Sequence, residues 1–129
     1  MSSETSIITE IMDLIELKKA LSELEAQYEM IKTMQTSDGV VRNVDVVIKD
    51  PNGRQVGLQK TQDGTYQFIA DSAGLSKEQL KQQQAFINKI KQRYSYNKIV
   101  DELKKQGYII AEEEKVQNNT IRLVARKWS

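Results

Sequence analysis

The chain of 129 residues contains no histidine and no cysteine. Without histidine it lacks the commonest general base, the commonest neutral metal ligand and the usual pH switch. Without cysteine it cannot form a disulfide, and zinc, haem and iron–sulfur sites lose their ordinary ligands. We therefore expect no cofactor. Of the metal sites, the composition does not exclude one for Mg²⁺ or Ca²⁺ that is built from carboxylates.

The sequence also lacks a long apolar run. No segment approaches the roughly 20 apolar residues that a membrane helix needs. The opening stretch MSSETSIITEIMDL has neither the basic region nor the apolar core of a signal peptide. We therefore expect a cytoplasmic protein with no membrane attachment.

The net charge is only +1, but it is distributed unevenly along the chain. Residues 1–50 hold ten acidic and five basic side chains, whereas residues 77–105 hold eight basic and three acidic ones. Such an asymmetry can steer a partner or promote self-association. It is too small to indicate nucleic-acid binding by itself.

Apolar periodicity predicts an α+β fold. Runs rich in β-branched or aromatic residues predict about six to seven strands, at 5–12, 28–36, 40–50, 54–61, 66–71, 108–116 and 120–128. Helical spacing with capping residues at Asp13 and Ser76 predicts helices at 14–26, 77–94 and 96–106, and Gly107 is expected to cap the end of the last one. The predicted apolar stripes of the three helices are Leu14, Leu17, Leu21, Leu24 and Tyr28, then Leu80, Ile87, Ile90 and Tyr94, and then Tyr96, Ile99, Val100 and Leu103. Turns are predicted at DPNG (50–53), QDGT (62–65) and QNN (117–119), and Tyr66, Phe68 and Ala70 should line one face of their strand. We expect a single domain, residues 1–129, in which an antiparallel sheet carries the helices on one face.

The strand at 40–50 suggests a docking patch. Val40, Arg42, Val44, Val46 and Ile48 would share one face of it, and Val41 and Val47 would point the other way. If the second face of the sheet is left open, Val41 and Val47 lie on a partly exposed apolar surface. The alternative is a sheet that curls and buries them.

The stretch KQRYSYNKIV, residues 91–100, sets two tyrosines among cationic and amide side chains. It is either a surface that stacks bases and contacts phosphates or the joint between two helices. Tyr94 continues the apolar stripe of the preceding helix, so its ring should pack in the core with its hydroxyl directed outward. The joint is favoured, and a nucleic-acid surface made of Lys89, Lys91, Arg93 and Lys98 is the alternative.

Acidic residues leave one further alternative, a carboxylate-metal enzyme. Glu112 and Glu114 would share one face of a strand, with Asp45 or Asp71 as the additional acid. No spacing supports that assignment. An acidic strand that resists edge-to-edge pairing is the favoured interpretation.

Several segments in combination suggest a family. DGTYQFIAD, QRYSYNKIVDELKKQGY and the ending TIRLVARKWS, together with MDLIELKKAL, resemble a conserved reading frame of cyanobacteria and algal plastid genomes. This is the family of unknown function called hypothetical chloroplast reading frame thirty-five-like, or domain of unknown function twelve-fifty-seven. The resemblance covers nearly the whole chain. The family tends to have tryptophans where this chain has Ser72 and Ala73, and often a histidine in place of Asn97.

The resemblance implies an accessory or adaptor role, because genes of the family often lie beside those of AAA-type ATPases. It also implies the plastid stroma as the compartment if the gene is plastid-encoded. We therefore predict a non-enzymatic interaction module with a protein partner. Its interaction surface is predicted at Lys89, Lys91, Arg93, Lys98, Val41 and Val47.

Overall fold

The computed structural model describes the backbone of residues 4–116 and 120–127 and the side chains of residues 9–110 and 124–127. Within these ranges, two helices accompany nine strands, and every strand pair is antiparallel. The predicted α+β class and antiparallel pairing are confirmed. The strands are divided among three sheets, however, and do not form the one sheet that the sequence suggested.

The main sheet has five strands in the order β1-β7-β6-β5-β2. They are β1 (Glu4–Ile8), β2 (Tyr28–Glu29), β5 (Val46–Lys49), β6 (Gln55–Lys60) and β7 (Tyr66–Asp71). The two predicted turns between β5, β6 and β7 are present, and each contains a glycine with positive φ, Gly53 at 79° and Gly64 at 89°. The two smaller sheets pair β3 (Thr33–Gln35) with β4 (Val41–Asn43), and β8 (Tyr108–Val116) with β9 (Thr120–Lys127).

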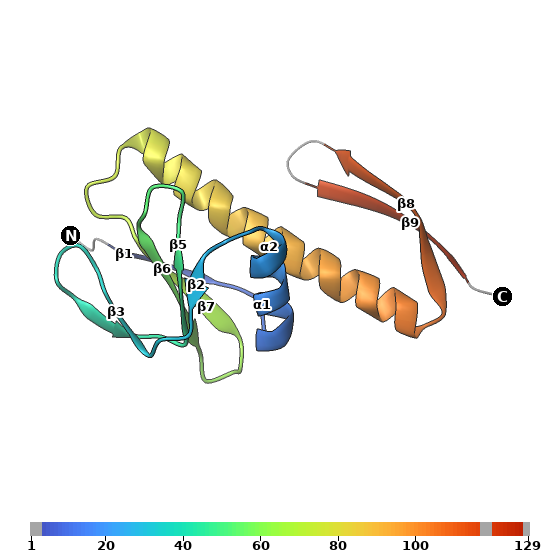
Figure 1. The fold of residues 1–129 in the computed structure, drawn as a ribbon, viewed down its shortest axis with the longest axis horizontal. Coiled ribbons are helices and arrows are strands. Elements are labelled where there is room, and N and C mark those ends of the chain that lie inside the picture. Colours follow the sequence, from blue (N-terminus) through green and yellow to red (C-terminus); the bar gives the residue numbers. More distant parts are fainter. Residues whose placement is uncertain (1–3, 117–119, 128–129) are drawn as a thin grey trace.

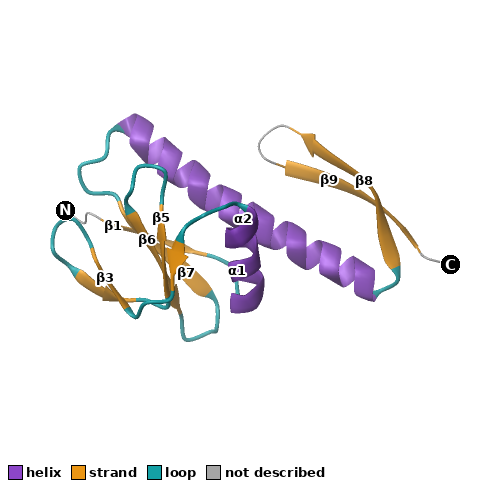
Figure 2. Ribbon diagram, in the orientation of Figure 1, coloured by secondary structure: helices purple, strands orange, loops and turns teal. Residues whose placement is uncertain are grey.

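Both helices, α1 (Leu14–Glu23) and α2 (Lys77–Lys105), pack against one face of the main sheet (Figures 1 and 2). The core between these layers contains Leu17 and Leu21 of α1 and Ile87 and Ile90 of α2. The sheet contributes Val46, Ile48, Val56, Leu58, Tyr66, Phe68 and Ala70. The predicted inward face of β7 and the predicted stripe on α1 are therefore confirmed. Leu80 was expected in the α2 stripe but is exposed, because it lies in the first turn of the helix.

The opposite face of the main sheet is partly covered by β3 and β4. The predicted single strand at 40–50 divides at Val44 and Asp45, whose backbone N–H groups donate to Lys32 O and Leu58 O, both at 2.8 Å. This change of partner places Val44 and Met34 on that face of the main sheet, where they form a small second cluster with Val47. The cluster lies on Gly57, where a Cβ atom would meet Met34 Sδ and would come within 2.7 Å of Val44 Cγ1.

Helix α1 begins where the sequence predicted and ends three residues earlier. The carboxylate of Asp13 accepts from Ile15 N at 3.0 Å and Glu16 N at 3.2 Å, which caps the first turn. The helix ends in a pair of backbone hydrogen bonds, from Ala26 N to Leu21 O and from Glu25 N to Ser22 O. Glu25 has φ 56°, so the chain turns in the left-handed conformation without a glycine.

Helix α2 is continuous, so the prediction of two helices with a joint near residue 95 is wrong. Ser76 and Gln79 form the predicted capping box at its start. Gly107, with φ 87°, follows its end as predicted. Its 29 residues extend past the main sheet. The pair β8–β9 follows the end of the helix and turns back alongside its C-terminal half (Figure 1). The predicted turn at 117–119 lies outside the described residues.

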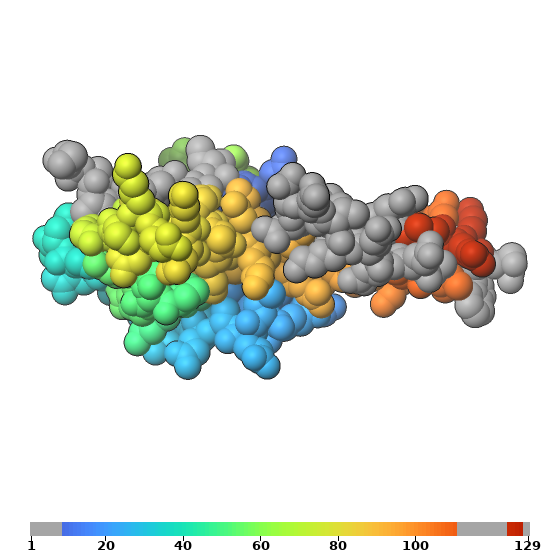
Figure 3. All heavy atoms as spheres, turned by 90° about the horizontal axis from the view of Figure 1, so that it is seen from above, coloured from blue at the N-terminus to red at the C-terminus, as the bar shows by residue number. Residues whose placement is uncertain are grey.

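In the space-filling view from above, α2 lies along the top of the molecule with the segment that follows α1 beside it (Figure 3). Within the described ranges, no helix is both long and apolar enough to cross a membrane.

Candidate interaction groove

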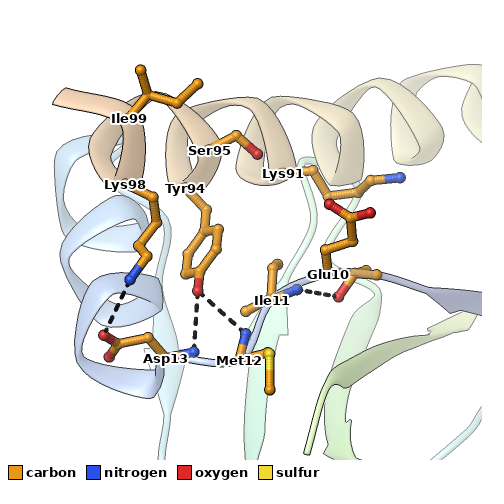
Figure 4. Close-up of a pocket in the computed structure, with 10 residues that line it drawn as sticks. Glu10, Ile11, Met12, Asp13, Lys91, Tyr94, Ser95, Lys98 and Ile99 are labelled. Atoms are coloured by element: carbon orange, nitrogen blue, oxygen red, sulfur yellow. Dashed lines mark hydrogen bonds and ion pairs between the residues drawn. The ribbon is translucent and has the colours of Figure 1, made fainter. Parts of the chain in front are cut away.

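A hollow of about 840 Å³ lies between α2 and the linker that joins β1 to α1 (Figure 4). The linker contributes residues 9–13 to its wall, and α2 contributes Lys91, Tyr94, Ser95, Lys98 and Ile99. The backbone of the linker is held by β7 and by the linker's own Thr9. Ile11 O accepts from Tyr66 N at 2.7 Å, and Ile11 N donates to Thr9 Oγ1 at 3.1 Å.

Tyr94 ties the helix to this linker. Its hydroxyl oxygen accepts hydrogen bonds from Met12 N at 3.2 Å and Asp13 N at 3.1 Å (Figure 4). The side chain is almost completely buried, as the sequence predicted for its ring. The expectation that the hydroxyl would be directed outward is wrong, because the linker crosses the end of the ring and provides two donors.

A second recess of about 430 Å³ continues the first one toward the C-terminal end of α2. The two share Asp13, Lys98 and Ile99, so they form one groove. Lys91, Lys98 and Lys105 line it at intervals of seven residues and therefore lie along one side of the helix. From Lys91 to Lys105 the helix rises about 21 Å, which sets the length of the groove.

Exposed apolar side chains border this groove. Met12 is 59% exposed and Ile99 is 52% exposed, and both line the first recess. Large apolar side chains with such exposures, gathered around a hollow, are typical of an interaction surface.

Two carboxyl groups face each other in the second recess. A hydrogen bond between the carboxyl groups of Glu16 and Asp101 raises the pKa of Glu16, with burial as the next cause. The same hydrogen bond lowers the pKa of Asp101. Glu16 Oε2 is inaccessible to solvent and has no hydrogen-bond partner among the side chains that the structure describes. The second recess therefore contains an acidic pair with one unpartnered oxygen.

Arg93 lies on a different side of α2 from the groove lysines. Its guanidinium donates to both carboxylate oxygens of Glu23 in α1, with Nε at 3.3 Å and Nη2 at 3.0 Å. The buried Asn97 donates to the same carboxylate at 2.5 Å. These contacts lower the pKa of Glu23, chiefly through the hydrogen bond from Arg93. Arg93 also stands over the ring of Tyr96, 5.0 Å from its centroid.

The structure separates the four basic residues that the sequence grouped together. Lys89 and Arg93 are four residues apart and share one side of α2, whereas Lys91 and Lys98 line the groove on another side. Lys98 Nζ lies 3.9 Å from Asp13 Oδ2. A single basic face at 89–98 is therefore not present, because these residues follow two different lines of one straight helix.

The predicted apolar patch is also divided. Val41 is 61% exposed on β4, but Val47 is only 5% exposed. The expectation of an exposed Val47 is wrong because Met34 and Val44 cover it. The change of sheet at Val44 also leaves Val40 and Arg42 exposed on the β4 side, away from the core that Val46 and Ile48 enter.

The acidic residues considered for metal binding have structural partners. Asp45 Oδ2 accepts from Lys60 N at 2.9 Å, and Asp71 Oδ2 accepts from Ser37 and lies 3.5 Å from Arg54 Nη1. The side chains of Glu112 and Glu114 lie outside the described residues. Among the side chains that are described, no group of three or more acidic residues is placed to hold a metal ion.

The residues that make the groove apolar were not predicted from the sequence. Met12 was assigned to a strand and Ile99 to a buried stripe, and no local signal marks either as exposed. The seven-residue spacing of the three lysines was present in the sequence and could have shown that they share a line on a continuous helix. Of the positions where this chain departs from the family resemblance, Asn97 is buried, and Ser72 and Ala73 are half-buried in the β7–α2 loop.

Comparison with known proteins supports the resemblance noted in the sequence. The model of the family described as "Protein of unknown function (DUF1257)" matches residues 20–124. The "Uncharacterized protein ycf35" of Pyropia yezoensis is 31% identical over 134 residues, covering 100% of this chain and 99% of the relative. The protein of the same name from Cyanophora paradoxa is 33% identical over 129 residues, covering 99% and 98%. No solved structure matches the chain.

Proposed function

The chain belongs to the DUF1257 family, and from the geometry of its groove we propose that it is a non-enzymatic interaction module, an adaptor or accessory subunit. The groove between α2 and the β1–α1 linker is its docking surface. The observation that carries this proposal is the exposure of two large apolar side chains, Met12 and Ile99, that line one hollow. Apolar surface of this kind gains free energy when a partner removes it from water.

The partner is a protein, and an AAA-type ATPase is the candidate that the family resemblance implies. The interaction is proposed to take place in the cytoplasm, or in the plastid stroma if the gene is plastid-encoded. The uneven charge of the chain supports a protein partner, because the groove lysines of α2 can steer an oppositely charged surface into place.

Site-specific photo-crosslinking tests this proposal in cells that express the protein. A photoreactive amino acid replaces Ser95, which is exposed on the wall of the groove. The matched control carries it at Lys81, which is also exposed on α2 but lies about 21 Å further along the helix. We expect one dominant crosslinked product from position 95 and none from position 81.

The identity of the product decides between occupants of the groove. A protein of another sequence supports the adaptor proposal, and an AAA-type ATPase supports its finer form. A product of twice the mass of the chain shows self-association at the groove and contradicts the adaptor role. Equal labelling from both positions, or none from position 95, contradicts the docking surface.

The nucleic-acid alternative is less well supported. Lys89 and Arg93 lie on one side of α2 and Lys91 and Lys98 on another, and Arg93 is engaged by Glu23. Fluorescence anisotropy with single-stranded RNA and DNA at low salt tests this alternative. Binding whose affinity falls steeply with added salt would favour it over the adaptor proposal.

A further inference from the structure

The first recess of the groove contains an unused hydrogen-bond donor. A tyrosine hydroxyl has one proton to donate and two lone pairs that accept. Both lone pairs of Tyr94 are engaged by Met12 N and Asp13 N. No described residue accepts its proton, and the side chain is only 6% exposed. A donor this buried gains free energy when an acceptor enters the recess beside it.

The surroundings of Tyr94 favour an acceptor with negative charge. Lys91 and Ser95 lie on the same wall, and Lys91 has no ion-pair partner among the described residues. Of the two acidic residues of this recess, Asp13 is already engaged by Ile15 N and Glu16 N at the start of α1. The exposed Glu10 is the remaining repulsive group, and Figure 4 shows its carboxylate beside Lys91 and away from the Tyr94 hydroxyl.

The surroundings of the second recess favour a group with positive charge. Glu16 and Asp101, which both line this recess, bring two carboxyl groups together there, and no described residue forms a hydrogen bond with the buried Glu16 Oε2. An ammonium or guanidinium group that enters the recess would relieve the repulsion between the two carboxyl groups. Lys98 and Lys105 also border this recess, but Lys98 is directed to Asp13.

The two ends of the groove are separated by a distance that corresponds to about two turns of a bound helix. Tyr94 and Asp101 are seven residues apart on α2, which is about 10.5 Å along the axis. Ile99 lies between them and is shared by both recesses, and Met12 faces the first one. The groove therefore presents a donor and cation, an apolar centre and an acidic pair, in that order along α2.

Building on the proposed function, we propose that the groove receives an amphipathic segment of the partner protein with one acidic and one basic side chain about two helical turns apart. The acidic side chain accepts from the Tyr94 hydroxyl beside Lys91, and the basic side chain binds next to the pair of Glu16 and Asp101. Apolar side chains between them cover Met12 and Ile99. The groove is open and about 21 Å long, which suits an extended macromolecular segment better than a small molecule.

A titration with designed peptides tests this charge pattern directly. The probe is a helix-forming peptide of about fifteen residues, with leucines on one side and a glutamate and a lysine about seven positions apart. Matched peptides replace the glutamate, the lysine or both by glutamine. Binding to the isotope-labelled protein is followed by NMR from the amide signals of Met12, Asp13 and Ile99, at peptide concentrations up to the millimolar range.

We expect the charged peptide to bind best and each single neutralisation to weaken binding about threefold to tenfold. In the variant Lys91→Gln, replacing the peptide glutamate should have little further effect, whereas replacing the lysine should still weaken binding. In the variant Asp101→Asn the pattern should be reversed. Lys81→Gln, a change of the same charge outside the groove, should leave all four affinities unchanged.

Equal affinity for all four peptides would show apolar docking alone and would overturn this inference, although Ser95 crosslinking could still support the proposed function. Absence of any shift with all four peptides, or tightest binding by the peptide that lacks both charges, would also overturn it. If Ser95 gives no crosslinked partner while the peptides follow the expected pattern, the groove has the proposed chemistry and the adaptor role is wrong.

Discussion

Tyr94 of α2 and Asp13 at the start of α1 are joined by a hydrogen bond of 3.1 Å from the Asp13 backbone N–H to the tyrosine hydroxyl oxygen. The neighbouring Met12 N–H donates to the same oxygen at 3.2 Å. One side chain of the long helix thus fixes the backbone that begins the short helix, and it forms the floor of the groove between them. Both the fold and the candidate site depend on this contact.

We predict that Tyr94→Phe destabilises the protein by about 1–3 kcal/mol, because two N–H groups lose their acceptor in a part-buried position. Urea denaturation followed by circular dichroism measures the change. Tyr28→Phe is the matched control, since no described residue forms a hydrogen bond with the Tyr28 hydroxyl, and it should change stability by less than about 0.5 kcal/mol. Equal effects of the two variants would contradict the role assigned to Tyr94.

A second prediction concerns Gly57, on which β3 and β4 rest. Gly57→Ala places a Cβ atom against Met34 Sδ and within 2.7 Å of Val44 Cγ1. We expect a loss of about 1–3 kcal/mol from this overpacking, measured by urea denaturation. Met34→Ala removes one of the two obstacles, so the double variant should be more stable than the sum of the single changes predicts. Additive effects would show that Met34 does not pack on Gly57.

The sequence predicted those parts of the fold that are encoded locally. The capping box of Ser76 and Gln79 marks the start of α2, and Gly107 marks its end. The alternation of Tyr66, Phe68 and Ala70 identified the inner face of β7, because successive side chains of a strand point to opposite faces. Each of these signals is contained in a few neighbouring residues.

The sequence did not predict features that depend on distant contacts. The run at 40–50 looks like one strand, and it divides because Val44 N donates to Lys32 O and leaves the main sheet. Ser95 between two tyrosines looked like a joint, and the helix continues through it because Tyr94 and Asn97 are both held by the α1 region. The groove depends on such long-range contacts, so its lining could not be recognised from local patterns.

A third prediction concerns a residue just past the C-terminal end of α1. Glu25 has φ 56°, a conformation that costs a residue with a Cβ atom roughly 1 kcal/mol. We expect Glu25→Gly to be about 0.5–1 kcal/mol more stable than Glu25→Ala, since both variants remove the same charge and only glycine relieves the strain. Thermal denaturation of the two variants measures the difference. A more stable alanine variant would show that the greater flexibility of glycine in the unfolded chain outweighs the relief.

The fourth prediction concerns Glu23, whose pKa is lowered below its ordinary value of 4.5, first by the hydrogen bond from Arg93. A group with a lowered pKa in the folded state contributes stability above its unfolded pKa and loses it as the pH falls through the folded value. Glu23→Gln should therefore lower the melting temperature at neutral pH, and the deficit should shrink as the pH falls below about 4.5. A deficit that stays constant with pH would show that the carboxylate charge is not responsible.

The last prediction concerns Glu16, in the same helix, where stability should depend on pH in the opposite direction from Glu23. The pKa of Glu16 is raised above 4.5, first by its hydrogen bond with Asp101. A raised pKa in the folded state contributes stability below the unfolded pKa, and this contribution is lost as the pH rises through the folded value. Glu16→Gln imitates the protonated form at every pH. Its melting temperature relative to the parent protein should therefore rise between acidic and neutral pH, whereas that of Glu23→Gln should fall.

Because Asp101 supplies the repulsion, the pH-dependent gain should be largely absent when Glu16→Gln is made in the Asp101→Asn background. If the gain persists there, burial of Glu16 and not its acidic neighbour sets the pKa, and the second recess loses the acidic pair that the groove offers to a basic side chain.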